Sequence, residues 1–176
     1  MPADRFVEAL NEQIGREFGA AQQYLAVAVW YDEQTLPRLA ALFYEQASEE
    51  RDHGLMMSRY LLESGLRPRI PGVGEPRGDF TDFREPIRVA LEQERKVTGQ
   101  ISELAGIARE ESDFVSEQFM QWFLKEQVEE IDLMATLLAV AERSPDRPVD
   151  VEDFIAREGI GAGEGGDPTA PPVAGA

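Results

Sequence analysis

The stretch "SGLRPRIPGVGEPRGDFT" (residues 64–81) determines how the rest of the chain can be arranged. It holds three prolines, at positions 68, 71 and 76, and four glycines. Proline lacks a backbone N–H and clashes with the preceding turn, so no helix can continue through this stretch. A connection of this length can run from one end of a helical bundle to the other. The sequence therefore predicts a long crossover between two halves.

Helical patterns lie on both sides of the crossover. Apolar residues recur three and four positions apart in four long segments that contain few helix breakers. The predicted helices cover residues 4–33, 36–64, 82–110 and 113–142. The connections "DEQTLP" (32–37) and "EESDF" (110–114) are short. Each pair of helices should therefore form an antiparallel hairpin.

The helix ends carry recognisable signals. Pro37 suits the first turn of the second helix. Ser112 or Asp113 is a suitable N-cap for the fourth helix, and Asp82 with Glu85 matches a capping box that opens the third. Two hairpins joined by one long crossover form the ferritin-like variant of the four-helix bundle. We therefore predict an all-α, ferritin-like antiparallel four-helix bundle.

The C-terminal part differs from the bundle. After "RSPDRP" (143–148), a short fifth helix is predicted near 150–158. Residues 159–176 are rich in glycine, proline and alanine, which is typical of a disordered tail. We therefore expect one domain over residues 1–158 and a tail over 159–176.

Composition limits the partners. The chain has 176 residues, and 17 Lys and Arg against 34 Asp and Glu give a net charge of −17. This acidity argues against binding to nucleic acids or to anionic membranes. The absence of cysteine excludes disulfides and thiolate metal sites. The longest apolar run, "LAVAVWY" (25–31), is shorter than the ~20 residues that span a bilayer. With no signal-peptide pattern at the N-terminus, we expect a cytoplasmic protein.

Each predicted helix has a polar residue on its apolar face. Residues seven apart lie on nearly one helical line, and Glu50 falls on the line of Leu36, Phe43 and Met57. His53, the only histidine, follows one turn later. The other helices are interrupted in the same way, by Glu17 in the first, Glu94 in the third, and Gln127 and Glu130 in the fourth.

These interruptions agree in height along the bundle. Glu17 and Glu50 are 33 residues apart and centred on the first connection, and Glu94 and Gln127 are 33 apart and centred on the second. Each pair should lie side by side, roughly 24 Å from its turn. An offset of 77 relates the two halves, taking Glu17 to Glu94, Glu50 to Gln127 and His53 to Glu130. The pattern predicts a pseudo-twofold axis with one polar cluster in mid-bundle.

The charge of this cluster points to metal ions. Four carboxylates in an apolar core would have to take up protons or destabilise the bundle, and no Lys or Arg lies on these lines. Two divalent cations would balance them. Oxygen-rich ligation with one imidazole suits iron, manganese or zinc better than copper. A single inward Glu or His is usually structural, but the agreement among four helices favours a di-metal site.

Four segments now resemble a known family, the haem-free bacterial ferritins, over about residues 3–158. They are "REFGAAQQYL" (16–25), "FYEQASEERDH" (43–53), "ALEQERKVTGQI" (90–101) and "QFMQWFLKEQVEEIDLMATLL" (118–138). The resemblance implies a ferroxidase that oxidises Fe(II) with O₂, and possible use of H₂O₂ as a further oxidant. It also implies a homo-oligomer of about 24 subunits that stores Fe(III) oxyhydroxide inside a hollow cage.

The resemblance also implies roles for individual residues. One iron would be held by Glu17, His53 and the bridging Glu50. The second would be held by Glu50, Glu94 and Glu130, with Gln127 nearby. 

A third iron position on the cavity side would use Glu49, Glu126 and Glu129, with Glu130 shared. Tyr24 matches a tyrosine beside the centre that is a candidate extra electron donor. Trp122 is a weaker candidate for that role, and a packing role is the alternative for both.

Two departures distinguish this chain from the bacterioferritins, and the second bears on haem. Those proteins carry a second E-x-x-H on the fourth helix, where this chain reads Gln127-Val-Glu-Glu130. They also place a haem-ligating Met directly after the bridging Glu, where this chain has Arg51. We therefore expect no haem.

Three other functions remain as alternatives. A manganese catalase or rubrerythrin would use a similar bundle, although rubrerythrins usually add a Cys-rich module. A DNA-coating mini-ferritin would form its centres between subunits, whereas here one chain holds a complete ligand set. A purely structural bundle would bind no metal and would tolerate Glu50→Leu.

Overall fold

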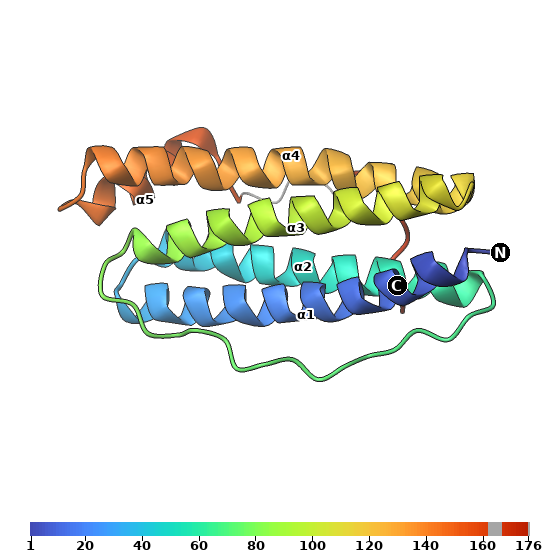
Figure 1. Ribbon diagram of the computed structural model, residues 1–176. Coiled ribbons are helices and arrows are strands. Elements are labelled where there is room, and N and C mark those ends of the chain that lie inside the picture. Colours follow the sequence, from blue (N-terminus) through green and yellow to red (C-terminus); the bar gives the residue numbers. More distant parts are fainter. Residues whose placement is uncertain (162–166, 176) are drawn as a thin grey trace.

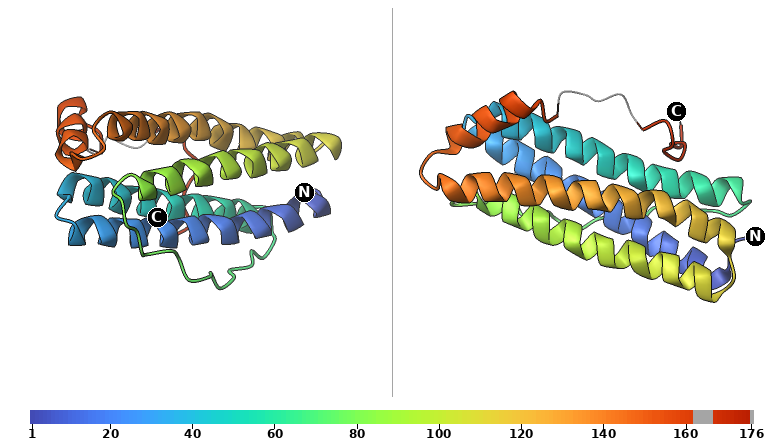
Figure 2. Two further views of the ribbon diagram at one scale, coloured as in Figure 1. Left: turned by 60° about the vertical axis from the view of Figure 1, so that its left-hand side comes forward. Right: turned by 90° about the horizontal axis from the view of Figure 1, so that it is seen from above.

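The predicted all-α bundle with one long crossover is confirmed. In a computed structural model, residues 1–161 and 167–175 are described. The helices are α1 (Asp4–Glu33), α2 (Pro37–Glu63), α3 (Glu85–Glu110), α4 (Phe114–Arg143) and α5 (Pro148–Glu158). The first four run side by side, and α5 lies at one end of the bundle (Figure 1, Figure 2). Within the described residues, no helix is both long enough and apolar enough to cross a membrane.

The two hairpins turn in the same way. Thr35 and Ser112, which are 77 residues apart, have left-handed φ angles of 59° and 57°. The amide that follows each of them donates to a carbonyl five residues earlier, from Leu36 to Tyr31 and from Asp113 to Ala108. This is the Schellman arrangement that closes a helix C-terminus. The predicted relation between the two halves therefore extends to their turns.

The predicted helix starts agree with the structure to within three residues, but the capping box predicted for α3 is wrong. Asp113 caps α4 by accepting a hydrogen bond from the Ser116 amide at 3.1 Å. The third helix begins at Glu85, not at residue 82. Asp82 accepts from the Arg84 amide at 2.8 Å, and the Glu85 carboxylate accepts from the Thr81 amide at 3.2 Å.

This pairing replaces the capping box predicted for α3. The two carboxylates fold a turn that precedes the helix instead of bonding to each other's backbone amides. Pro86, in the first turn, has the fixed φ that suits a helix start at this point.

The crossover follows α1 along the bundle (Figure 1). The Gln23 side chain accepts from the Arg77 amide at 3.0 Å and donates to the Arg77 carbonyl at 2.8 Å. At Gly15, an added Cβ would lie only 2.7 Å from Cγ of Pro71. Glycine at this position therefore lets the crossover lie against the helix.

Helix α5 is fixed to the start of α2. The Glu152 carboxylate, which is 8% exposed, accepts from the backbone amides of Arg38 and Leu39, with a shortest distance of 2.8 Å. Helix α2 has no side-chain cap of its own. A carboxylate near a helix N-terminus satisfies free N–H groups and the positive end of the helix dipole.

The predicted disorder of residues 159–176 falls partly outside the described residues, which omit 162–166 and 176. For residues 167–175 the structure gives contacts where the sequence predicts disorder. Asp167 accepts from the Trp122 indole at 3.1 Å and from Lys125 at 3.2 Å. The Val173 carbonyl accepts from Arg59 at 2.9 Å. A domain boundary at residue 158 stays a prediction.

The apolar core forms two clusters. One, toward the α1–α2 turn, includes Tyr31, Phe43 and Leu137. The other, toward the opposite end, includes Leu10 and Met120. A layer of buried polar side chains lies between them, and this layer contains the predicted site.

Candidate metal centre

Six buried polar side chains from all four long helices form the polar layer. None of them is more than 5% exposed. They are Glu17 of α1, Glu50 and His53 of α2, Glu94 of α3, and Gln127 and Glu130 of α4. Their apolar neighbours at positions three, four and seven away keep these helix faces turned inward. The sequence-predicted cluster in mid-bundle is therefore present in the fold.

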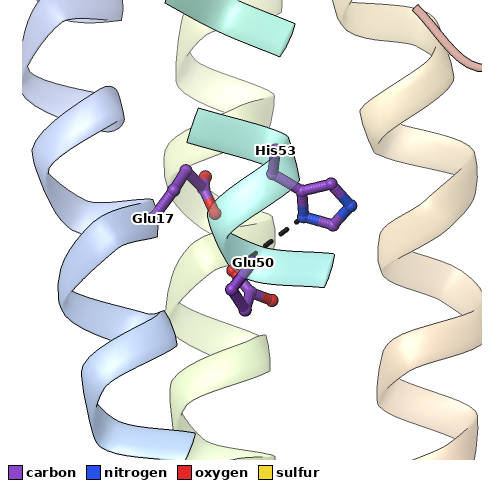
Figure 3. Close-up of side chains that lie close together, drawn as sticks. All are labelled: Glu17, Glu50 and His53. Carbon is purple, nitrogen blue, oxygen red and sulfur yellow. Dashed lines mark ion pairs between the residues drawn. The ribbon is translucent and has the colours of Figure 1, made fainter. Parts of the chain in front are cut away.

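Three of these residues converge most closely. Glu17, Glu50 and His53 each offer a ligand atom, and these atoms lie within 4.8 Å of one another. Figure 3 shows Glu17 projecting from α1 toward α2, where Glu50 and His53 lie one turn apart. The His53 Nδ1 to Glu50 Oε2 distance is 3.9 Å. In the described part of the chain, no other trio of His, Asp or Glu meets this distance.

Aromatic rings cover the His53 side of the layer. The imidazole meets the rings of Trp122 and Phe123 edge to face, with centroids 5.7 Å away in both cases. Both rings come from α4. They shield the imidazole on that side and limit its rotation.

The remaining carboxylates accept hydrogen bonds from the protein. The Tyr24 hydroxyl donates to Glu94, and the Gln127 amide donates to the same carboxylate at 3.0 Å. Glu130 accepts from the Gln46 amide at 3.4 Å. Glu94 and Glu130 must therefore exchange or share these donors in order to bind a cation.

Burial changes the charge state of the layer. It raises the pKa of Glu17, Glu50 and Glu130 well above the usual range, and repulsion between neighbouring carboxylates adds to the shift. Burial also raises the pKa of Glu94, although hydrogen bonds from Tyr24 and Gln127 oppose this. Without a cation, the layer favours protonated carboxyl groups. A bound cation would displace these protons.

The donor set fits divalent cations. One oxygen of each of Glu17, Glu50 and Glu130 is buried and has no hydrogen-bond partner in the described structure. An unsatisfied buried polar atom costs about 1–3 kcal/mol. Metal ions among these oxygens would remove that cost. Carboxylates with one imidazole suit Fe²⁺, Mn²⁺ or Zn²⁺.

A second acidic feature adjoins the layer. Six glutamates from α2, α4 and α5 line a cavity of about 330 Å³, which we call the acidic cavity; they are Glu45, Glu49, Glu126, Glu129, Glu130 and Glu158. It brings together Glu49, Glu126 and Glu129, the residues predicted for a third metal position, and includes the shared Glu130. Burial raises the pKa of Glu49 and of Glu126. Glu129 is exposed.

The lines of residues seven apart that predict the polar layer from the sequence miss two buried glutamines of the site. Gln13 donates to Glu17 at 2.7 Å. Gln46 donates to Glu49 and to Glu130. Each glutamine lies four residues before Glu17 or Glu50, so a line of residues seven apart does not pass through both members of a pair. A polar residue one turn before a buried carboxylate is the signal that could have revealed them.

Comparisons with known proteins agree with this geometry. A family model described as a ferritin-like domain matches residues 7–144. Ferritin BfrB of Mycobacterium tuberculosis, named bacterioferritin BfrB in another strain, is 51% identical over 157 residues, covering 89% of this chain and 87% of the relative. Ferritin BfrB of Mycolicibacterium smegmatis is 50% identical and covers 97% and 93%. A bacterial non-heme ferritin of Staphylococcus aureus is 36% identical and covers 77% and 82%.

Solved structures give the same result. An open-pore ferritin from the archaeon Archaeoglobus fulgidus aligns with a TM-score of 0.84 at 28% identity, covering 92% of this chain and 99% of that one. A closed form engineered from the same ferritin aligns with a TM-score of 0.85 at 27% identity, covering 93% and 99%. The family model alone spans most of the bundle, and the described ligand set lies inside its limits. The chain belongs to the ferritin family.

Proposed function

We propose that this protein stores iron, and that the polar layer is a ferroxidase centre within each subunit. Fe(II) is the substrate, O₂ is the oxidant, and the product is an Fe(III) oxyhydroxide mineral held inside a cage of about 24 subunits. Membership of the ferritin family supports storage. The observation that carries the ferroxidase proposal is the set of buried, unpartnered carboxylate oxygens on Glu17, Glu50 and Glu130.

The proposed centre has two iron positions. Glu17, His53 and Glu50 would hold the first Fe(II), because their ligand atoms already converge. Glu50, Glu94 and Glu130 would hold the second, with Gln127 nearby. The first position has an imidazole and the second has only oxygen donors and an amide, so the second should release its metal more readily.

The protein contributes position and charge rather than redox chemistry. Carboxyl groups that hold protons in the metal-free layer release them as Fe(II) binds. Each of the two irons then gives one electron to O₂, which takes up two protons and leaves as H₂O₂, and holding the two ions side by side makes both electrons available at once. The acidic cavity next to Glu130 gives oxidised iron a path of anionic ligands away from the layer.

Tyr24 and Trp122 are adjacent to the centre. Tyr24 is fully buried and donates to Glu94, which supports a role as an extra electron donor. Burial raises the pKa of its hydroxyl well above the usual range, so the phenol stays protonated near neutral pH. Trp122 contacts His53 and donates to Asp167, which favours a packing role.

We propose that the protein is haem-free. Arg51, at the position where a bacterioferritin has its haem-ligating Met, is exposed and pairs with Asp52 at 3.3 Å. Protein produced with a haem supplement should show no haem absorption band after purification, and a band at one haem per subunit pair would contradict this.

Aerobic iron oxidation tests the proposed centre. Fe(II) added to the iron-free protein should give a fast rise in ferric absorbance that saturates at two irons per subunit, before slower mineral growth. Glu17→Ala and His53→Ala should slow the fast phase by about 10- to 100-fold or more. The matched control is Glu8→Ala, which removes an exposed acid from the same helix and should change neither phase. A stoichiometry of one iron, or unchanged kinetics in both site variants, would contradict the proposal.

The mass of the assembly in solution distinguishes an iron-storage protein from another di-metal oxidoreductase. A storage protein needs an enclosed volume, so we expect an assembly of about 24 chains that retains iron through gel filtration. A monomer or dimer with a working di-metal centre would favour the oxidoreductase alternative, as in a manganese catalase or rubrerythrin.

A further inference from the structure

Gln46 joins the polar layer to the acidic cavity. It lies on α2, four residues before Glu50, and is 4% exposed. Its amide nitrogen donates to Glu49 on the same helix and to Glu130 on α4, the latter at 3.4 Å. Glu130 belongs to the proposed second iron position, and Glu49 lines the acidic cavity. One amide group therefore contacts a carboxylate of each.

The oxygen of the same amide is also available to bind a cation. Gln46 Oε1 is buried and has no hydrogen-bond partner among the described residues. Gln46 itself lines the acidic cavity. An amide oxygen is a neutral donor suited to hard cations, and a buried one without a partner gains from binding such a cation.

The charges around Gln46 explain why a neutral donor is needed there. Its amide nitrogen donates to Glu49 of α2 and, at 3.4 Å, to Glu130 of α4, so one neutral group bridges two carboxylates from facing helices. Without the amide, these two carboxylates would lose the hydrogen-bond donor that they share in the described structure. Glu130 would then be free to turn away from its partner carboxylates.

We propose that Gln46 is a positioning residue that holds Glu130 in place and controls the transfer of iron from the second iron position into the acidic cavity. The proposal rests on the ferroxidase function proposed above. Its amide nitrogen orients Glu130 and Glu49, and its amide oxygen offers a neutral ligand between the two carboxylates as the ion moves.

Gln13 provides a matched comparison. It is also buried and lies one turn before a ligand, and its amide donates to Glu17 at 2.7 Å. Its other contacts are Gln100 and Arg16, and it does not line the acidic cavity. The two glutamines therefore support opposite sides of the layer.

Redox-inert Zn²⁺ tests positioning without relying on turnover. The variants are Gln46→Met, which keeps the side-chain length but has no N–H, and Gln13→Met. Crystals of each assembled variant would be soaked over a series of Zn²⁺ concentrations and the anomalous signal measured at both positions. Gln46→Met should weaken binding beside Glu94 and Glu130 by about 10- to 100-fold and leave the position beside Glu17 and His53 unchanged. Gln13→Met should show the reverse.

Recovery of the fast phase tests transfer. Two Fe(II) per subunit are added first. The shortest delay after which a second addition again gives the fast phase measures how quickly the centre empties. Gln46→Met should lengthen this delay by about tenfold or more, and Gln13→Met should not. Gln46→Leu repeats both measurements with a smaller apolar side chain in case the Met variant does not assemble.

The outcomes are distinct. If both Gln46 variants bind Zn²⁺ at the second position and recover as fast as the unmodified protein, the role of Gln46 is overturned. If the Gln46 and Gln13 variants give the same pattern, the effect is general packing and the role is also overturned. If the unmodified protein shows no fast phase at two irons per subunit, the proposed ferroxidase function itself fails.

Discussion

Glu50 occupies a position where the helix pattern would place leucine. Its carboxylate lies beside Glu17 and His53. Burial raises the pKa of this carboxylate, and the charges of Glu94 and Glu130 raise it further. One of its oxygens is buried without a hydrogen-bond partner. In the metal-free protein this residue therefore destabilises the core, and only a bound cation would make it stabilising.

The variant Glu50→Leu should separate these two effects. Replacing a buried, uncompensated carboxylate by an apolar side chain should raise the stability of the metal-free protein by up to about 1–4 kcal/mol. The same variant should lose the stabilisation by Zn²⁺, which for one site at a hundredfold excess over Kd is about 2.7 kcal/mol. Thermal unfolding with and without Zn²⁺ measures both. The absence of any Zn²⁺ effect on the unmodified protein would support the purely structural bundle, and an unchanged Zn²⁺ effect in Glu50→Leu would show that Zn²⁺ binds outside the polar layer.

The buried carboxylates of the polar layer could be predicted from the sequence, and the glutamine amides that contact them could not. Glu17, Glu50 and Glu94 break apolar lines at one height, and that height follows from helix geometry alone. Gln13 and Gln46 are polar residues on the same faces, but their partners depend on side-chain direction. Gln46 reaches Glu130, 84 residues away, and nothing in the local sequence specifies this contact.

Among the helices, the paired turns carry backbone strain. Thr35 and Ser112 adopt positive φ where glycine is normally preferred, and a β-branched residue such as threonine is especially unfavourable there. Gly65, at the end of α2, shows the unstrained alternative with φ of 77°. The bundle therefore tolerates strain at the two hairpins.

Glycine at these turns should stabilise the protein. Thr35→Gly should raise the free energy of unfolding by about 0.5–1 kcal/mol, because relief of strain exceeds the entropy that glycine adds to the unfolded chain. Ser112→Gly should have the same sign and a smaller size, and Gly65→Ser should have the opposite sign. Thermal unfolding of the assembled proteins measures all three. A loss of stability in Thr35→Gly would show that its side chain makes a necessary contact.

The N-cap of α4 predicts a pH dependence. Burial raises the pKa of Asp113, but hydrogen bonds from Ser116 and the Ala3 amide outweigh this and leave the pKa below its usual range. Because the folded pKa is lower than the unfolded value of about 3.9, the stabilisation is present above that value. It is lost as the pH falls through the folded pKa.

The variant Asp113→Ala should therefore lose about 1 kcal/mol of stability at neutral pH. The difference in free energy of unfolding between this variant and the unmodified protein should become smaller as the pH falls below about 4. Asp113→Asn keeps a cap acceptor and should lose less at neutral pH. Thermal unfolding over this pH range provides the measurement, and a gap that stays constant with pH would exclude the ionised cap as its cause.

The start of α3 shows where local motifs mislead. Asp82 and Glu85 have the spacing of a capping box, yet their side chains bond to Arg84, Arg77 and Thr81 instead. The prolines and glycines before residue 82 correctly indicated a break. These prolines and glycines did not indicate how far the turn before α3 extends, because the length of the turn depends on contacts with Arg77 in the crossover.

The subunit as a whole is two related hairpins with a polar layer between two apolar clusters. The offset of 77 predicted this layer and also relates the turns at Thr35 and Ser112. Contacts over long chain distances could not be predicted in the same way. Glu152 caps α2 across 113 residues, and Asp167 reaches Trp122 across 45. Both need the folded bundle to bring their partners together.

The proposed function depends on paired cations among the buried acids of the four long helices. Anomalous diffraction from crystals soaked in Fe(II) without oxygen would locate them. We expect two iron positions in each subunit, one between Glu17, Glu50 and His53 and the other between Glu50, Glu94 and Glu130. Unchanged side chains with no anomalous density between them, at Fe(II) concentrations that saturate oxidation in solution, would contradict it.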